Sequence, residues 1–202
     1  MRVRRKKQFP FGKGVKWYLN VGRGDGHDFL DYASGYFDAA NLVSKHIIDS
    51  RDASGEIALQ VGIYPVLYLY RQATELALKH FIYDKPNAAP LRKSHNLEKL
   101  WKEARPEIQT MLEQNGGKNE MKALKKLDKF IARMHAADPS GEAFRFPEDL
   151  QRAKYLQEFK EINLEPIYKS SKEAGETLIW FADARTEIRA DEYEAMQELE
   201  CN

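Results

Sequence analysis

The sequence predicts an all-α protein, an up-and-down bundle of four to five main helices preceded by a short extended segment. Apolar residues recur at the three- and four-residue spacing of amphipathic helices along most of the 202 residues, and only residues 16–21 are short and β-prone. The composition, with 43% apolar and 31% charged residues, fits one medium-sized globular domain with or without appendages. We therefore expect one bundle over residues 28–190, flanked by charged termini.

Residues 1–27 are the first flanking segment, which we expect to be a basic arm. Residues 16–21 are predicted to be extended and the glycine-rich residues 22–26 to be a turn, which lacks the lysine and hydroxyl residue of a phosphate-binding loop. The whole chain has a net charge of only +1, yet residues 1–16 hold no acid and seven basic side chains: Arg2, Arg4, Arg5, Lys6, Lys7, Lys13 and Lys16. Such a block is commonly a solvated terminus; the alternative is that its first five basic residues contact nucleic-acid phosphates.

Two helices are expected to follow the arm. Asp28 is a suitable N-cap, and apolar residues at helical spacing indicate an amphipathic helix from there to about Ile48. Residues 56–82 are apolar around most of a helix circumference, and we expect Pro65 to kink or split this helix. We place it at the centre of the bundle, in contact with the last helix around Leu178.

Two further helices are predicted in the middle of the chain. Ser94 or Asn96 can cap a helix that runs toward Leu112, with a bend or restart at Pro106. After a two-glycine connection, near-heptad spacing marks a helix with the core positions Met121, Leu124, Leu127, Ile131 and Met134. Its polar face is rich in lysine, at Lys118, Lys122, Lys125, Lys126 and Lys129. A solvated face is the usual meaning of such a pattern, and contact with phosphates is the alternative.

The last long helix is expected to begin near Leu164 and to place a stripe of apolar and small residues toward the core, as far as Arg185. Residues 138–141 end the preceding helix, and residues 142–147 form an ordered connection. Residues 187–202 hold six acids against one base, so we expect an acidic C-terminal tail over residues 191–202.

Several classes of protein are excluded by the composition. The longest apolar stretch, residues 57–70, is shorter than the roughly 20 residues of a transmembrane helix, and the basic N-terminus is not followed by the apolar region of a secretory signal. The single cysteine, Cys201, argues against disulfides, and the histidines do not stand at a recognised zinc-ligand spacing. We expect a cytoplasmic protein with no membrane contact, metal or other cofactor.

Three clusters combine residues that could carry chemistry. In the first, Arg71, Glu75 and Lys79 are spaced i, i+4 and i+8 on the central helix, so they share a face and can form a ladder of ion pairs. Charges in so apolar a helix need such partners. The ladder is interpreted either as a structural network between helices or as a ligand-binding or active site.

The second cluster centres on His95, at the predicted start of a helix. The helix macrodipole disfavours the charged imidazole there and favours a neutral group that is suited to acid–base work. The alternative is a structural role, in which this segment caps the helix and forms hydrogen bonds between helices.

The third cluster follows the lysine-rich helix. Phe144 and Phe146 are expected to enter the core, while Arg145 points the other way and meets a carboxylate, either Asp138 or Glu75. We expect the three clusters to form one ligand-binding or structural polar network, with the members Arg71, Glu75, Lys79, His95, Asn96, Asp138 and Arg145.

In this order, the clusters resemble the HEPN superfamily (higher eukaryotes and prokaryotes nucleotide-binding), over residues 28–188. The resemblance is carried by Arg71-Gln72-Ala73-Thr74-Glu75-Leu76-Ala77-Leu78-Lys79, then His95-Asn96-Leu97-Glu98-Lys99-Leu100-Trp101, and then Phe144-Arg145-Phe146-Pro147. It implies a helical bundle, often a homodimer, frequently encoded in bacterial toxin–antitoxin, abortive-infection or phage-defence systems. It also implies metal-independent ribonuclease activity in many members.

The chain departs from the ribonuclease pattern of that superfamily. Ribonuclease members have an arginine that is followed, after four to six residues, by a histidine, and this chain has no pair in that order and at that spacing. The resemblance therefore favours a module that binds RNA, a nucleotide or a protein partner. Two alternatives stay open: a divergent metal-independent endoribonuclease with the candidate catalytic residues His95, Arg71 and Arg145, and a purely structural dimerisation protein.

Overall fold

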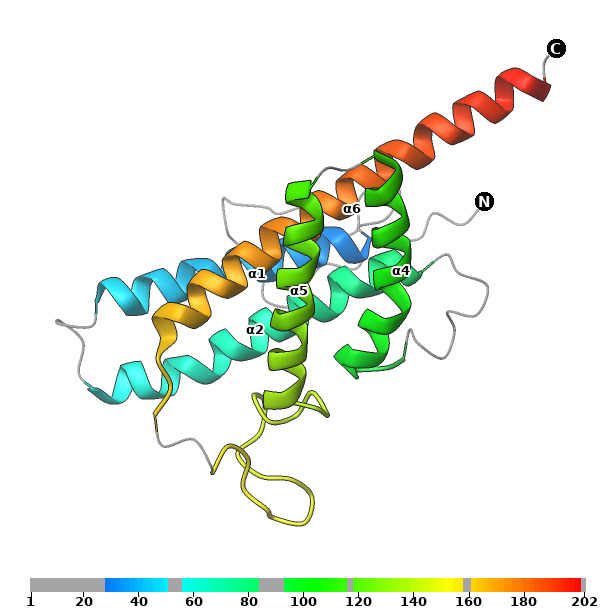
Figure 1. Cartoon of the computed structure of the whole chain (residues 1–202). Helices are drawn as coiled ribbons and strands as arrows, with labels where there is room; N and C mark the ends of the chain where they lie inside the picture. Colours follow the sequence, from blue (N-terminus) through cyan, green and yellow to red (C-terminus); the bar gives the residue numbers. More distant parts are fainter. Residues whose placement is uncertain (1–27, 51–55, 84–92, 116–117, 158–160, 201–202) are drawn as a thin grey trace, which may run out of the picture.

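A computed structural model of the chain shows a helical bundle (Figure 1), which confirms the predicted all-α fold. The structure describes residues 28–50, 56–83, 93–115, 118–157 and 161–200. These residues contain five helices and no strand, and an isolated bridge joins Glu148 and Lys154. The predicted basic arm, extended segment and glycine-rich turn of residues 1–27 lie outside the described residues, as does Cys201.

Helix α1 (Phe29–Asp49) begins at the predicted N-cap. The Asp28 side chain accepts hydrogen bonds from the backbone N–H groups of Leu30 and Asp31, at 2.7 and 3.1 Å. The Asp31 side chain accepts one from the backbone of Asp28, which completes a capping box. This reciprocal pairing satisfies backbone donors that have no partner within the helix.

Helix α2 (Glu56–Ile82) is the central element of the bundle. Pro65, where a kink or break was expected, lies inside the helix and does not end it. The helix packs against α1, α4 and α6, which explains why it is buried on several sides from Val66 onward. Its buried apolar residues are Val66, Leu67, Tyr70, Ala73, Ala77, Leu78, Phe81 and Ile82.

Helices α4 (Leu97–Asn115) and α5 (Lys118–Ala137) form a hairpin that crosses α2 and α6 steeply (Figure 1). Asn96 is the cap of α4, because its Oδ1 accepts a hydrogen bond of 2.9 Å from the backbone N–H of Lys99. Pro106 lies within α4 without ending it. Across the hairpin, the Asp128 carboxylate accepts hydrogen bonds from Nε of Arg105 at 2.6 Å and from Nε1 of Trp101 at 2.9 Å.

Helix α6 (Leu164–Glu200) is the longest element, with 37 residues. The predicted core stripe is confirmed by its buried residues Ser171, Ala174, Leu178, Phe181, Ala182 and Arg185. At Gly175 the helix lies so close to α1 that an added Cβ would stand 2.8 Å from the ring of Phe37. The acidic segment expected as a tail from residue 191 is the helical end of α6, which projects from the bundle (Figure 1).

Every helix among the described residues falls short of the length and hydrophobicity that a bilayer-spanning helix needs.

Candidate functional site

Four charged side chains are buried together where α2 meets the segment after α5. Arg71, Glu75 and Lys79 of α2 are 2%, 1% and 5% exposed, and Asp138 is fully buried. The set contains two cations and two anions, so the formal charges balance. Because an unpaired buried charge costs several kcal/mol, we interpret this balance as the condition that allows the cluster to sit in the core.

Glu75 lies at the centre of the cluster. Its Oε2 accepts a hydrogen bond of 2.9 Å from Arg71, and its Oε1 accepts one of 2.8 Å from Nζ of Lys79. The predicted i, i+4 ladder is therefore present. Burial raises the pKa of Glu75, but the hydrogen bond and charge of Lys79, the charge of His95 and the hydrogen bond of Arg71 outweigh burial and hold the pKa below its usual value.

Arg71 ties α2 to two other segments of the chain. Its Nε lies 3.1 Å from Oδ2 of Asp138, and its Nη2 donates a short hydrogen bond to the backbone carbonyl of His95. Asp138 in turn accepts hydrogen bonds through Oδ1 from three backbone N–H groups, at residues 141, 142 and 143. Arg71 thus holds the start of α4, and Asp138, which pairs with Arg71, holds the turn that follows α5.

His95 connects this cluster with the surface. Its Nδ1 lies 3.0 Å from Oε1 of Glu75, while the histidine side chain is 61% exposed. In the tautomer that carries its proton on Nδ1, this nitrogen donates a hydrogen bond to the Glu75 carboxylate, which sets the ring orientation and leaves Nε2 as a proton acceptor. The arrangement is therefore chemically able to perform acid–base catalysis, and it also serves as a structural clamp between α2 and α4.

Two expectations for the third cluster are wrong. Arg145 does not meet Asp138 or Glu75; its guanidinium is exposed and lies over the rings of Tyr68 and Phe146, 5.9 and 5.0 Å from their centroids. Phe146 is 48% exposed, so only Phe144 of the two phenylalanines enters the core. The reason is the path of the turn, which brings Asp138 to Arg71 instead.

The structure therefore joins five of the seven predicted network residues by direct side-chain contacts: Arg71, Glu75, Lys79, His95 and Asp138. Asn96 stands beside them as the cap of α4, and Arg145 lies apart from them on the surface. The predicted nucleic-acid contacts Arg2, Arg4, Arg5, Lys6 and Lys7 lie outside the described residues. The described residues hold no group of three or more His, Cys, Asp or Glu side chains that could bind a metal ion.

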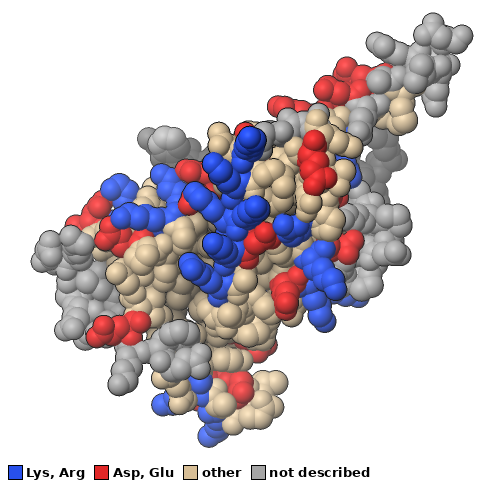
Figure 2. Space-filling model, in the orientation of Figure 1, with Lys and Arg blue, Asp and Glu red and all other residues tan. Residues whose placement is uncertain are grey.

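A second feature is an open groove between α5 and α6, with a volume of about 490 Å³. Its floor is apolar, with contributions from Leu67, Leu127, Phe130, Met134, Phe144, Ile167 and Ala174. Its rim carries Lys126, Lys129 and Arg133 of α5, and Lys126 forms an ion pair with Glu173 of α6. Figure 2 shows basic side chains gathered over this part of the molecule. The lysine-rich pattern indicated the charges, but only the packing of α5 against α6 creates the groove.

Comparison of the chain with protein-family models, curated proteins and solved structures gives no match.

Proposed function

We propose that the chain is a HEPN-like helical module that binds RNA through one basic stripe of α5. The observation that carries the proposal is the arrangement of six basic residues on one face. At 3.6 residues per turn they fall within about 100° of the helix circumference. The basic stripe consists of Lys118, Lys122, Lys125, Lys126, Lys129 and Arg133.

The charges of the basic stripe are suited to phosphate contact. Lys122, Lys125, Lys129 and Arg133 are exposed, and none of them has an ion-pair partner among the described residues. The nearby acid Asp128 does not neutralise them, because it faces α4 and pairs with Arg105. The stripe extends about 22 Å along the helix at 1.5 Å per residue, enough to meet several phosphates of one strand.

The resemblance to HEPN proteins favours RNA as the nucleic acid. What supports this resemblance is that residues from all three quoted segments lie close together or pack against the same helix. Arg71 and Glu75 of the first contact His95 of the second, and Arg145 of the third lies over Tyr68 of α2. Binding of this kind would be independent of base sequence and sensitive to salt.

The test is binding of a fluorescently labelled single-stranded RNA, measured by anisotropy. We expect Lys122→Glu/Lys125→Glu to weaken binding at least tenfold, and the matched control Lys99→Glu/Lys102→Glu on α4 to leave it nearly unchanged. For the wild type, log K should fall by about 0.7 per phosphate neutralised for each unit of log salt. Equal affinities for the two double variants, or binding without salt dependence, would contradict the proposal.

A second candidate is a divergent metal-independent endoribonuclease, which the contact between Glu75 and His95 favours. Glu75 would accept the hydrogen bond of Nδ1–H, and Nε2 of His95 would take the proton of a ribose 2′-hydroxyl. The 2′-oxygen would then bond to the adjacent phosphorus while the bond from phosphorus to the 5′-oxygen breaks, and the departing 5′-oxygen would take a proton from water, which leaves a 2′,3′-cyclic phosphate. Arg71 would be a positioning residue, because its guanidinium is buried and engaged by Glu75 and Asp138.

This candidate is tested by incubating structured RNA with the protein in EDTA. Cleavage by the wild type, loss of cleavage in His95→Asn and retained RNA binding in that variant would support it. If the wild type binds the RNA but does not cleave it, the ribonuclease candidate is wrong and the chain is a binding module.

A further inference from the structure

The groove between α5 and α6 combines an apolar floor with positive charge on one wall. Its lining includes the cations Lys126, Lys129 and Arg133, all from α5, and one anion, Glu173 of α6. Three cations and one anion give the lining a formal charge of +2. Glu173 pairs with Lys126, whereas Lys129 and Arg133 are exposed and have no ion-pair partner among the described residues. The two unpaired charges therefore face any ligand that enters the groove.

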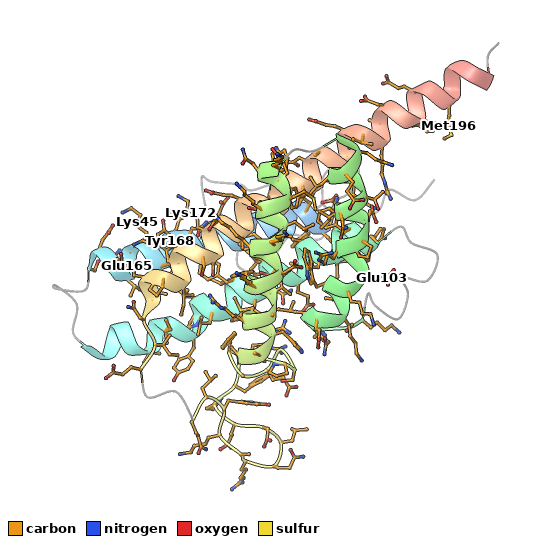
Figure 3. All side chains as sticks on the ribbon, in the orientation of Figure 1. Lys45, Glu103, Glu165, Tyr168, Lys172 and Met196 are labelled. Atoms are coloured by element: carbon orange, nitrogen blue, oxygen red, sulfur yellow. The ribbon has the colours of Figure 1, made fainter. Side chains whose placement is uncertain are left out.

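The α6 wall of the groove adds no cation. Figure 3 shows Tyr168 and Lys172 near Lys45 of α1, on the other side of α6 from α5. The side chains that α6 does contribute are apolar or carry a hydroxyl, apart from Glu173. A ligand in the groove therefore meets unpaired positive charge only along α5.

The hydroxyl groups of the groove are engaged or out of reach. Ser170 Oγ donates to the backbone carbonyl of Pro166 at 2.8 Å, and Thr177 Oγ1 donates to that of Glu173 at 2.7 Å. The Ser171 hydroxyl has no hydrogen-bond partner in the described part of the chain, but this residue is fully buried below the floor. A polar group placed on the floor would lose its hydrogen bonds to water without replacement, which is unfavourable. The floor therefore suits a hydrocarbon.

We propose that the groove binds a free fatty acid, with the hydrocarbon chain on the apolar floor and the carboxylate against Lys129 and Arg133. These two side chains stand at i and i+4 on α5, so both can contact one carboxylate, and the guanidinium can do so through two parallel hydrogen bonds. The groove volume of about 490 Å³ lies within the range of about 300–1,000 Å³ for small-molecule sites. This inference goes beyond RNA binding and does not depend on it.

Other occupants match the groove less well. The edges of a nucleobase carry polar atoms that the floor leaves unpaired, and RNA phosphates need the charges but no apolar floor. The basic stripe continues beyond the groove at Lys122 and Lys125, so RNA and the carboxylate share only the rim. A docked helix needs an apolar trough along several of its turns, whereas α5 and α6 cross steeply and the two walls diverge (Figure 1). A flexible hydrocarbon chain with one anionic end meets both the shape and the charge of the groove.

The test is calorimetric titration of the full chain with dodecanoate below its micelle concentration, without RNA. We expect saturable binding at one site per chain. Each buried CH₂ group contributes about fourfold in affinity, so each step from octanoate to decanoate to dodecanoate should tighten binding about fifteenfold. Dodecyltrimethylammonium has the same chain with the opposite charge, and we expect it to bind at least tenfold more weakly than dodecanoate.

Two charge variants test the head-group contact. We expect Lys129→Gln/Arg133→Gln to weaken dodecanoate binding at least tenfold and to leave the gain per CH₂ group unchanged. The control Lys99→Gln/Lys102→Gln removes the same charge from α4, outside the groove, and should bind dodecanoate as the wild type does. All four positions are exposed, and circular dichroism checks that the variants fold.

A third variant tests the floor. Ser170 is exposed and lines the groove, so Ser170→Phe places a ring where the chain would lie and should weaken every carboxylate of the series. Ser140→Phe, at an exposed position outside the groove, is the matched control and should leave binding unchanged.

Absence of saturable dodecanoate binding would overturn the proposal, as would equal affinities for dodecanoate and dodecyltrimethylammonium. Binding of an acidic amphipathic peptide in place of dodecanoate, lost in Lys129→Gln/Arg133→Gln, would assign the groove to a partner helix. Loss of RNA binding in that variant with unchanged dodecanoate affinity would assign the rim to RNA alone, which also overturns the proposal. Dodecanoate binding as expected in a wild type that binds no RNA would support this inference and contradict only the RNA proposal.

Discussion

Glu75 and His95 meet at the junction of α2 with the start of α4, with Oε1 and Nδ1 3.0 Å apart. The carboxylate is buried and the histidine is largely exposed, so this contact joins the core to the surface. Glu75 is held in place by Arg71 and Lys79, and the orientation of His95 therefore depends on the buried ion pairs beneath it. One residue, Glu75, supports both the fold and the candidate site.

The first prediction concerns the charge of Glu75. Glu75→Gln keeps the shape of the side chain but leaves Arg71 and Lys79 with only Asp138 as a buried counter-charge. We expect the free energy of unfolding to fall by about 3–5 kcal/mol, measured by urea denaturation at neutral pH. The control Glu161→Gln, at an exposed site, should change stability by less than about 0.5 kcal/mol. A similar small loss in both variants would show that the network contributes little.

The same carboxylate predicts a dependence of stability on pH. Because the folded-state pKa of Glu75 lies below its ordinary value of 4.5, the stabilisation is fully present above pH 4.5. It is lost as the pH falls through the folded-state pKa. We expect Glu75→Gln to lack this part of the acid destabilisation, so its melting temperature should change less than that of the wild type between neutral pH and about pH 3. If the melting temperatures of the wild type and Glu75→Gln fell equally between neutral pH and about pH 3, Glu75 would not be the source of this acid destabilisation.

The second prediction concerns Gly141, in the turn that Asp138 organises. Its φ is +84°, and an added Cβ would lie 3.1 Å from the guanidinium carbon of Arg71. Gly141→Ala therefore strains the backbone by roughly 1–2 kcal/mol and also pushes on a buried ion pair. We expect a larger loss of stability than for Ala at the exposed Ser140, measured by thermal unfolding. Equal melting temperatures for Gly141→Ala and Ser140→Ala would show that the turn relaxes freely.

The residues of the network show which contacts of the site can be predicted from the sequence. The pairs Arg71–Glu75 and Glu75–Lys79 were predictable, because an i, i+4 spacing in a helix places side chains together. It was not predictable that Asp138 pairs with Arg71 and not with Arg145. This pairing depends on the path of the turn, which is set by Gly141 and by three backbone hydrogen bonds to Asp138.

The same distinction holds for the fold. The bounds of α1 followed from its N-cap and its apolar period, both of which are local signals. Of the two effects expected of Pro65, a kink or a split, the split does not occur, because one helix continues through this residue; tertiary packing can override such a local preference. The groove was not predictable at all, because it arises from the distance between α5 and α6.

The third prediction concerns Tyr70, whose hydroxyl lies between α1 and α2. It donates to Oδ1 of Asn41 at 2.9 Å and lies 3.1 Å from the hydroxyl of Ser44, which is fully buried. Tyr70→Phe leaves that serine without its partner, so we expect a loss of about 1–3 kcal/mol in the free energy of unfolding. Tyr70→Phe/Ser44→Ala should be less destabilised than the sum of the single variants.

The buried hydroxyl of Tyr70 also predicts how the stability of the fold depends on pH above pH 10. Burial raises its pKa to about 12, above the ordinary value of 10.0 and despite the hydrogen bond with Ser44. The resulting stabilisation is fully present below pH 10 and is lost as the pH rises toward 12. Tyr70→Phe should lack this component, and a wild type and variant that lose stability equally above pH 10 would exclude it.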